Sequence, residues 1–383
     1  MQKNILLIPD SYKDCLSAEK VANALEKGCK LFNENFNFFS HPLSDGGEGA
    51  TIFLQNNIAH NTINTTSINA IGEKILTNYL DLHNKSAFIE LAATSGIQAI
   101  PISLRTPLYT NTFGTGLVIK HAIENGFKEI FLSLGGSATN DGGAGILQAL
   151  GFIFKDENDC IIEHVNGSTL RNIKTIVPPK YIEKVKFTFA ADVQNILLGE
   201  NGATYTYATQ KGAKPSELDS LEKGMRHFAN VLMNLTKKDL TKETSSGAAG
   251  GAAFGLMHFY EYNVTSGFEI LCERSGLEEK IKTADLIITG EGKTDKQTLN
   301  GKLVFKACEL AKRHNKPIFI FSGRLEGHVD LRKALDYSYI YTHEVSPKNL
   351  SFDQIKEISE ELITRKCYEE IKTYFSLQKS TCD

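Results

Sequence analysis

The residues with the clearest chemical potential in this chain form a glycine-rich segment at 135–145, with the sequence GGSATNDGGAG. The segment follows a short apolar run, 128–134, and precedes a stretch that we expect to be helical. Glycine lets the backbone approach a ligand closely, and the first turn of a helix offers unpaired N–H groups and a partial positive charge. The segment therefore predicts an anion site, best suited to phosphate, although a tight turn with a helix N-cap is the alternative.

Four more segments place a carboxylate, a hydroxyl or an ammonium group close to glycine or to the end of a predicted strand. Because ligands of open α/β sheets collect at the carboxyl ends of the strands, we expect all five segments to converge. Such convergence is much harder to explain by chance than any single glycine cluster. The four segments are Asp10-Ser11-Tyr12-Lys13, Ser44-Asp45-Gly46-Gly47-Glu48-Gly49, Asp192 with Gln194 and Asn195, and Gly290 to Lys302 with Asp295.

Together these segments contain what phosphoryl transfer requires. The reaction needs donors around the phosphate oxygens, a divalent metal, cations for the developing charge, and a carboxylate that orients the attacking hydroxyl. Magnesium suits such a site, since it prefers one or two carboxylates plus phosphate oxygens. The candidate base and metal-binding carboxylates are Asp45, Asp192 and Asp295, and the candidate cations are Lys13, Lys293 and Lys302.

Each of these residues also has a purely structural interpretation. An aspartate before Gly-Gly, such as Asp45, is often a turn former whose side chain bonds its own backbone. Asn140 or Asp141 can simply cap the following helix. Lys13 can be a solvated surface lysine, as most lysines are.

Several common motifs are absent. Residues 290–294 end in Gly-Lys-Thr, but a P-loop needs a glycine where this chain has Ile287, and no Gly-x-Gly-x-x-Gly pattern is present at 143–148. The ten histidines show no metal-ligand spacing, and the seven cysteines are scattered without a Cys-x-x-Cys pair. We therefore expect neither a zinc site nor a disulfide scaffold.

The composition is that of an ordinary globular protein. With 383 residues, 41% hydrophobic and 23% charged, the chain predicts two domains. The net charge of −3 gives no broad basic field, so we expect no nucleic-acid partner. No segment reaches the ~18 consecutive apolar residues of a membrane span, and no signal pattern is evident. We expect a cytoplasmic protein, without a membrane partner, that is a monomer or a homodimer.

The order of predicted elements indicates how the domains are built. Strand and helix alternate at 4–40 and again beyond 285, which predicts parallel sheets. At 62–91, Thr- and Ile-rich alternation predicts successive strands of an antiparallel or mixed sheet. Since we expect the first strand to find its parallel partners among the late strands, both chain ends are expected to build one domain with the middle inserted. The cleft between the domains is then the default site.

The motifs resemble those of the type I glycerate kinases, and they do so in order over nearly the whole chain. The resemblance implies phosphorylation of D-glycerate by ATP with Mg²⁺. It also implies a flavodoxin-like domain at 1–66 plus 284–383 and an inserted α/β domain at 67–283. The motifs are Ile8 to Lys13, Ser44 to Gly49, Gly135 to Gly145, Gln210-Lys211-Gly212-Ala213, and Thr289 to Asp295 with Gln297-Thr298 and Gly301-Lys302.

On this basis we expect Asp192 to orient the substrate hydroxyl and Asp45 to act in catalysis. Asp45 and Asp295 are expected to hold Mg²⁺ or to order the phosphate loops. Ser11 and Lys13 are expected to engage the glycerate carboxylate or a phosphate. Gln194, Lys293, Cys15 and Arg324 depart from the usual family residues, and we expect activity to survive these changes. The expected substrate- and phosphate-binding residues are Asp10, Ser11, Lys13, Gly46, Gly47, Gly135, Gly136, Ser137, Asn140, Asp141, Lys293 and Lys302.

The expected product is 2-phosphoglycerate. Production of 3-phosphoglycerate and phosphorylation of another small hydroxy acid are alternatives within the same class. A non-catalytic sensor of a nucleotide or a sugar-acid phosphate is the alternative from a different class. Carboxylates in ligand loops count against the sensor, because an anion binder gains nothing from negative charge unless a metal is present.

Overall fold

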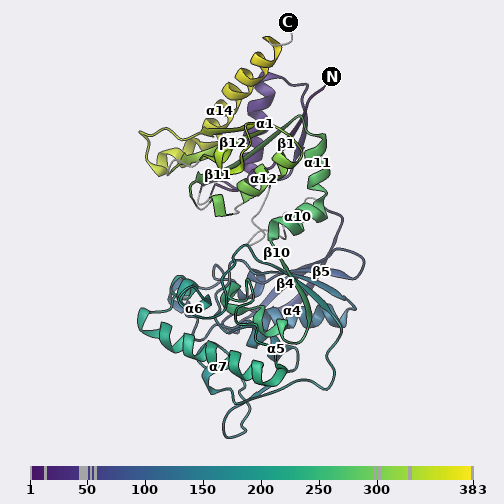
Figure 1. Ribbon diagram of the computed structural model, residues 1–383, viewed down its shortest axis with the longest axis vertical. Coiled ribbons are helices and arrows are strands. Elements are labelled where there is room, and N and C mark those ends of the chain that lie inside the picture. The colour runs from purple at the N-terminus through teal and green to yellow at the C-terminus, as the bar shows by residue number, and fades with distance from the viewer. Residues whose placement is uncertain are drawn as a thin grey trace. The chain divides into compact units, whose positions relative to one another are not determined.

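The computed structural model describes residues 2–12, 15–42, 51, 54–55, 58–296, 298–300, 303–326 and 330–380 (Figure 1). The chain forms two compact units, one of Met1–Asp45 with Leu271–Asp383 and the other of Gly46–Ile270. Among the described residues, every helix is too short or too polar to cross a lipid bilayer.

The first unit contains a five-stranded sheet in which all neighbouring strands are parallel. In space the strands follow the order β13-β12-β11-β1-β2. Counted along the chain within this unit, that is the order 2-1-3-4-5 of the flavodoxin-like fold. The predicted α/β class, with a flavodoxin-like domain built from both chain ends, is confirmed. The strands are β1 (Asn4–Leu7), β2 (Asn37–Ser40), β11 (Leu286–Thr294), β12 (Ile318–Leu325) and β13 (Ile340–Glu344).

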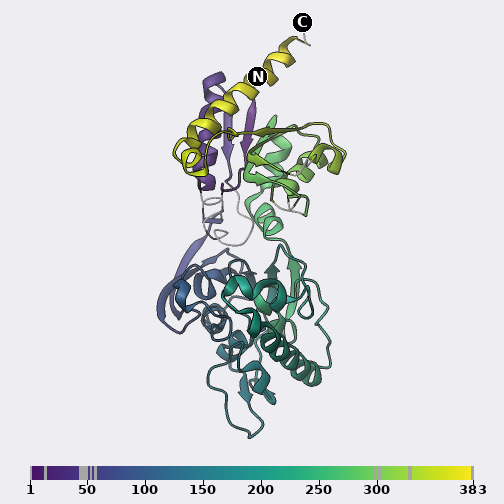
Figure 2. The same cartoon turned by 90° about the vertical axis from the view of Figure 1, so that its left-hand side faces the viewer.

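Helices cover this sheet, which explains why its strands are almost continuously apolar. α1 and α14 lie side by side over alternate strand residues such as Ile5, Ile288 and Phe319 (Figure 1, Figure 2). The two helices approach closely at Gly28, where an added Cβ would lie 2.6 Å from the carbonyl oxygen of Thr364. The helices are α1 (Ala18–Phe32), α10 (Gly267–Ser275), α11 (Leu277–Thr283), η5 (Thr298–Asn300), α12 (Leu303–Arg313), α13 (Leu331–Leu335) and α14 (Phe352–Ser380).

The second unit contains a six-stranded mixed sheet in the order β10-β9-β6-β5-β4-β3. β3, β4 and β5 pair antiparallel, as the alternation at 62–91 predicts, and β5, β6, β9 and β10 pair parallel. β7 and β8 form a separate antiparallel pair. The strands are β3 (Asn61–Ile68), β4 (Lys74–Asp81), β5 (Ser86–Glu90), β6 (Glu129–Ser133), β7 (Ile153–Lys155), β8 (Thr175–Val177), β9 (Lys186–Ala190) and β10 (Glu261–Thr265).

The core of the second unit is rich in aromatic side chains, including Phe152, Phe187 and Phe254, which are buried. The helices are α3 (Ala92–Ser95), η1 (Ile102–Leu104), α4 (Phe113–Glu124), α5 (Ala144–Ala149), η2 (Leu170–Asn172), α6 (Ala203–Tyr207), η3 (Thr209–Lys211), η4 (Pro215–Glu217), α7 (Leu218–Thr236), α8 (Ala248–Gly251) and α9 (Phe254–Met257).

The glycine- and alanine-rich run at 247–256 is closely packed, but it does not form one regular helix. It forms α8 and α9, and Ala249 and Gly250 inside α8 have left-handed φ values of 54° and 72°. An added Cβ on Gly250 would lie 2.0 Å from the carbonyl oxygen of Thr139. The run is bent so that its backbone can contact the glycine-rich segment.

The chain passes from the first unit to the second after Asp45 and returns to the first unit after Ile270. The sequence predicts these domain boundaries at 66/67 and 283/284. The difference comes from β3 and α11. β3 pairs along its whole length with β4 of the six-stranded sheet, and α11 contacts β1 and α12 of the first unit. The predicted boundaries stay a prediction that limited proteolysis can test.

Candidate functional site

The carboxyl edge of the five-stranded sheet brings together two of the predicted segments. The backbone N–H of Asp10 donates to the carbonyl of Gly290 at 2.8 Å, so the residues after β1 run beside the second half of β11, which extends to Thr294. The carboxylate of Asp10 accepts a hydrogen bond from the backbone N–H of Ser11 at 2.6 Å. The next strand of the sheet after β1 is β2, at one edge, whereas the next strand after β11 is β12, in the direction of the opposite edge. This is the topological switch point, where ligands of such sheets bind.

The segment that follows Gly290 carries two carboxylates in different environments. Glu291 is buried and accepts hydrogen bonds from the hydroxyls of Thr294 at 2.9 Å and Thr298 at 2.8 Å. Asp295 is half-buried and forms an ion pair with Lys293, Nζ to Oδ2, at 3.4 Å. The ammonium of Lys293 also pairs with Glu326 at 2.7 Å, and this hydrogen bond is the main cause that raises the pKa of Lys293.

The carboxyl edge of the six-stranded sheet places Asp192 next to the glycine-rich segment. Ser133 at the end of β6 is in register with Ala190 at the end of β9. The backbone N–H of Leu134 donates to the carbonyl of Ala190 at 3.1 Å, which continues this pairing beyond the strands. Asp192 and Gly135 therefore follow neighbouring strands at one edge, and Asp192 is exposed.

The start of the glycine-rich segment offers a row of backbone donors. Gly136 has a left-handed φ of 69°, and its carbonyl accepts a hydrogen bond from Ile97. Within the part of the chain that the structure describes, the backbone N–H groups of Gly135, Gly136 and Ser137 donate to no protein acceptor. Successive free N–H groups around a left-handed residue form a concavity that binds anionic oxygens.

The end of the segment is organised by Asp141. Its carboxylate is fully buried and accepts hydrogen bonds from the backbone N–H and hydroxyl of Thr112, both at 2.8 Å. It also accepts from the backbone N–H groups of Gly143 at 3.2 Å and Gly145 at 3.3 Å, at the start of α5. Burial raises the pKa of Asp141, and these four hydrogen bonds oppose the rise. This geometry favours the structural alternative, in which Asp141 caps α5.

Two buried polar atoms of the segment lack a partner in the described residues: Oγ1 of Thr139 and Oδ1 of Asn140. The amide nitrogen of Asn140 donates to the hydroxyl of Thr204 at 3.2 Å. An unpaired buried polar atom costs about 1–3 kcal/mol, so such atoms mark positions where a ligand or water completes the bonding.

The residues 245–251 hold this segment and the Asp192 loop together. The hydroxyl of Ser245 donates to the carbonyl of Val193 at 2.7 Å. The backbone N–H of Gly142 donates to the carbonyl of Gly250 at 3.1 Å. The two loops are therefore fixed by a common support.

Sequence reasoning missed two charged residues as site candidates, Lys211 and Glu291. The ammonium of Lys211 donates to the hydroxyl of Ser137 at 2.7 Å and to the carbonyl of Thr139 at 2.8 Å. Lys211 was noted only as part of a family motif, and nothing in its neighbours along the chain indicates burial. Glu291 lies between two glycines after an apolar run within β11, a position that could have drawn attention to it.

The structure thus forms two groups of predicted site residues. Asp10, Ser11, Lys293 and Asp295 lie in the first unit, and Gly135, Gly136, Ser137, Asn140, Asp141 and Asp192 lie in the second. Lys13, Asp45, Gly46, Gly47 and Lys302 lie outside the described residues. The expectation that Asp45, Asp192 and Asp295 share one cleft stays a prediction. Among the described residues, no three His, Cys, Asp or Glu side chains are grouped to hold a metal ion.

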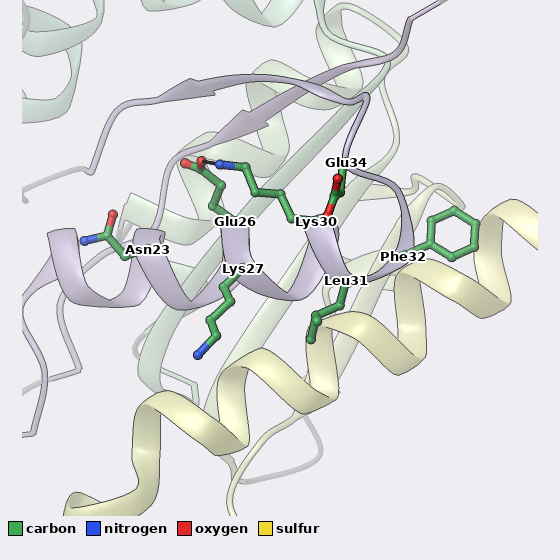
Figure 3. Close-up of a pocket in the computed structure, with 7 residues that line it drawn as sticks. All are labelled: Asn23, Glu26, Lys27, Lys30, Leu31, Phe32 and Glu34. Atoms are coloured by element: carbon green, nitrogen blue, oxygen red, sulfur yellow. Dashed lines mark ion pairs between the residues drawn. The ribbon is translucent and has the colours of Figure 1, made fainter.

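One surface cavity of the first unit lies away from Asp10 and Ser11. It has a volume of about 520 Å³ and is lined by residues of α1, from Asn23 onward, and of the following turn (Figure 3). Because β1 and β2 are parallel, the connecting α1 runs back toward the amino ends of the strands. The cavity is therefore remote from the carboxyl edge. Its lining residues are Asn23, Glu26, Lys27, Lys30, Leu31, Phe32 and Glu34.

The fold and these segments define a two-domain α/β protein in which Asp10, the glycine-rich segment and Asp192 follow the carboxyl ends of strands, whereas residues 290–294 form the second half of β11. The chain belongs to the glycerate kinase family, whose model matches residues 5–374. It is therefore an enzyme of a kinase family, and the resemblance drawn from the motifs is confirmed.

Individual relatives agree with this assignment. The chain is 37% identical to the glycerate 2-kinase of Escherichia coli K12 over 85% of its length and 86% of that protein. It is 33% identical to the glycerate kinase of Halalkalibacterium halodurans over 94% of its length and 95% of that protein. A crystal structure of a Salmonella typhimurium LT2 protein, provisionally named glycerate kinase 2, superposes with a TM-score of 0.82. That protein is 32% identical, and the match covers 99% of this chain and all of the other.

Proposed function

We propose that this protein transfers the γ-phosphoryl group of ATP to the 2-hydroxyl of D-glycerate and releases 2-phosphoglycerate and ADP, with Mg²⁺ as cofactor. The observation that carries the proposal is the 37% identity, over 85% of the chain, to a protein named glycerate 2-kinase. The row of free N–H groups at Gly135 to Ser137 supports it, because both substrates present anionic oxygens.

Three of the predicted groups would have distinct chemical tasks in this reaction. The N–H groups of the glycine-rich segment would donate to phosphate or carboxylate oxygens and stabilise the charge that develops on them. The carboxylate of Asp192, exposed at the same sheet edge, would orient the glycerate hydroxyl and accept its proton. The ammonium of Lys293 would add positive charge beside the phosphates.

The half-buried carboxylate of Asp295 fits a magnesium ligand, since it presents hard oxygen atoms near the switch point of the sheet. Asp45 would be the second carboxylate. When bound, Mg²⁺ supplies charge neutralisation between the phosphate oxygens. The residues of the chain would hold the ion and keep the phosphates in line with the hydroxyl.

The test is release of ADP on mixing the protein with D-glycerate, ATP and Mg²⁺, followed by phosphorus NMR of the product. Glycerate-dependent ADP release with a 2-phosphoglycerate signal supports the proposal, and 3-phosphoglycerate would correct the position of transfer. Turnover only with tartronate or L-glycerate would change the substrate. Tight ligand binding without any turnover would favour the sensor.

A further inference from the structure

A buried lysine holds the glycine-rich segment. Lys211 is only 3% exposed, and it stands at the end of η3, well separated in sequence from the segment that it contacts. Its ammonium has two protein acceptors, the hydroxyl of Ser137 at 2.7 Å and the carbonyl of Thr139 at 2.8 Å. Among the described residues it forms no ion pair within 4.0 Å. A buried ammonium without a paired carboxylate is costly, and its two hydrogen bonds offset part of that cost.

The hydrogen bond from Lys211 fixes the direction of the Ser137 hydroxyl. An ammonium can only donate, so the Ser137 oxygen is the acceptor of this bond. The hydroxyl proton of Ser137 must then be donated elsewhere, and within the described part of the chain it has no acceptor. Ser137 directly follows Gly136, which is exposed, and its own backbone N–H is one of the three free donors.

We propose that Lys211 is a positioning residue. By donating to the Ser137 oxygen, it leaves the Ser137 hydroxyl proton to be donated to an anionic oxygen of a substrate. The oxygen belongs to a carboxylate or to a phosphate, and both are chemically equivalent for this donor. The inference rests on the proposed function, since it assigns a residue to the substrate site of that reaction. Lys211 acts through Ser137 and does not itself touch the substrate.

The charge state of Lys211 supplies a readout. Burial lowers the pKa of Lys211 to about 7, and the nearby Asp141 opposes part of this effect. Below this pH the ammonium donates to Ser137. Above it the neutral amine can accept the proton of Ser137, which removes that proton from the substrate. An anionic ligand favours the charged form, so substrate binding should weaken as the pH rises through about 7.

Other titratable groups near Lys211 are engaged elsewhere. Arg105, whose carbonyl lies against Gly212, donates from its guanidinium to the carbonyl of Ile100 at 2.9 Å. On the adjacent α6, the hydroxyls of Tyr205 and Tyr207 bond to Asp219 and Asn195. Among the described residues, Asp141 is the charged group that shifts the pKa of Lys211, and it opposes the lowering by burial.

The competing explanation is that Lys211 merely clamps the segment. A clamp would stabilise the fold, and its loss would affect the Michaelis constants, KM, of both substrates whether or not Ser137 is present. A positioning role predicts instead that the effect of Lys211 on one KM disappears when the Ser137 hydroxyl is removed.

The experiment is a double-mutant cycle with Lys211→Met and Ser137→Ala, measuring kcat and KM for ATP and for D-glycerate. We expect each single variant to raise one KM by about 10-fold or more, and the double variant to raise it no further. A change in the KM of D-glycerate identifies a carboxylate, and a change in the KM of ATP identifies a phosphate. The proposal would be overturned if the KM increase in the double variant equalled the product of the increases in the two single variants. It would also be overturned if the KM values of ATP and D-glycerate changed equally.

Two further variants complete the test. Lys211→Arg keeps a permanent donor, so it should retain low KM and lose the rise of KM above pH about 7. Lys223→Met removes an exposed lysine of α7 and is the control for loss of a surface charge. If Lys211→Met does not fold, the pH profile decides the matter, because the rise of KM must be present in the wild type and absent in Ser137→Ala.

The outcome is separable from the proposed function. If the wild type releases no ADP with D-glycerate, the proposed function fails. Calorimetric binding of ATP and of D-glycerate to the same variants then tests the coupling of Lys211 and Ser137. If the wild type is active and the two residues are not coupled, the inference about Lys211 fails alone.

Discussion

Replacing Lys211 by methionine should change how the stability of the protein depends on pH. Burial lowers the pKa of Lys211 in the folded protein from 10.5 to about 7. Between these values the unfolded chain binds a proton that the folded chain does not bind. The free energy of unfolding of the wild type therefore rises with pH in this window, by up to about 1.4 kcal/mol per pH unit. Below pH about 7 both states carry the proton, and this contribution stays constant.

The methionine variant has no group that titrates at this position, so it lacks this slope. The variant also loses hydrogen bonds to Ser137 and Thr139, worth about 1–3 kcal/mol each for a charged donor. Much of that loss is a constant offset, whereas the titration appears only as a change with pH. The difference in unfolding free energy, wild type minus variant, should grow by about 2 kcal/mol from pH 7 to pH 9.

Urea unfolding of both proteins across this pH range measures the difference, and near-equal slopes against urea would show that the same transition is compared. Lys223→Met, which removes an exposed lysine, should follow the wild type at every pH. If the curves of wild type and Lys211→Met run parallel from pH 7 to pH 9, Lys211 does not titrate as a buried lysine. The pH argument for its coupling to Ser137 would then be refuted.

Three further substitutions test the site. Gly250→Ala should destabilise the protein by about 2–4 kcal/mol, because Gly250 has a φ of 72° and an added Cβ would lie 2.0 Å from the carbonyl of Thr139. Gly126→Ala, at a φ of 88° with open space around the position, should cost only about 1–2 kcal/mol in the same denaturation assay, and equal losses would refute the packing argument. Asp141→Asn should cost about 2–3 kcal/mol in urea unfolding, since the amide nitrogen would face donors that now meet a carboxylate oxygen. Asp192→Asn should lower kcat by about 10²-fold or more in the ADP-release assay, and a rate near that of the wild type would remove Asp192 from proton transfer.

Local sequence patterns predicted much of the fold. The run 4–8 and the apolar residues after 285 are buried strands of one parallel sheet, as alternation with helices indicates. The alternation ends in a final helix, which extends over Phe352–Ser380. Such patterns are predictive because a strand buried on both faces requires a continuous apolar run, and an amphipathic helix requires apolar residues at helical spacing.

The sequence predicted less of the candidate site. Asp141 was expected in phosphate binding, and its burial with four internal hydrogen bonds favours a capping role that the sequence offered only as an alternative. The glycine- and alanine-rich run at 247–256 also gives no local signal of the left-handed bend at Ala249 and Gly250. Both features depend on which backbone groups come close in space, and a run of glycines leaves that question open.

The sequence by itself determined the alternation of strands and helices, the flavodoxin-like domain from both chain ends, and the glycine-rich segments that mark the family. Only the tertiary structure decided that Lys211 is buried against Ser137, which lies 74 residues away along the chain. The physical reason is the distance along the chain over which each interaction acts. Periodicity and turn chemistry act between near neighbours, whereas the burial and charge state of a side chain are set by whatever the completed fold packs around it.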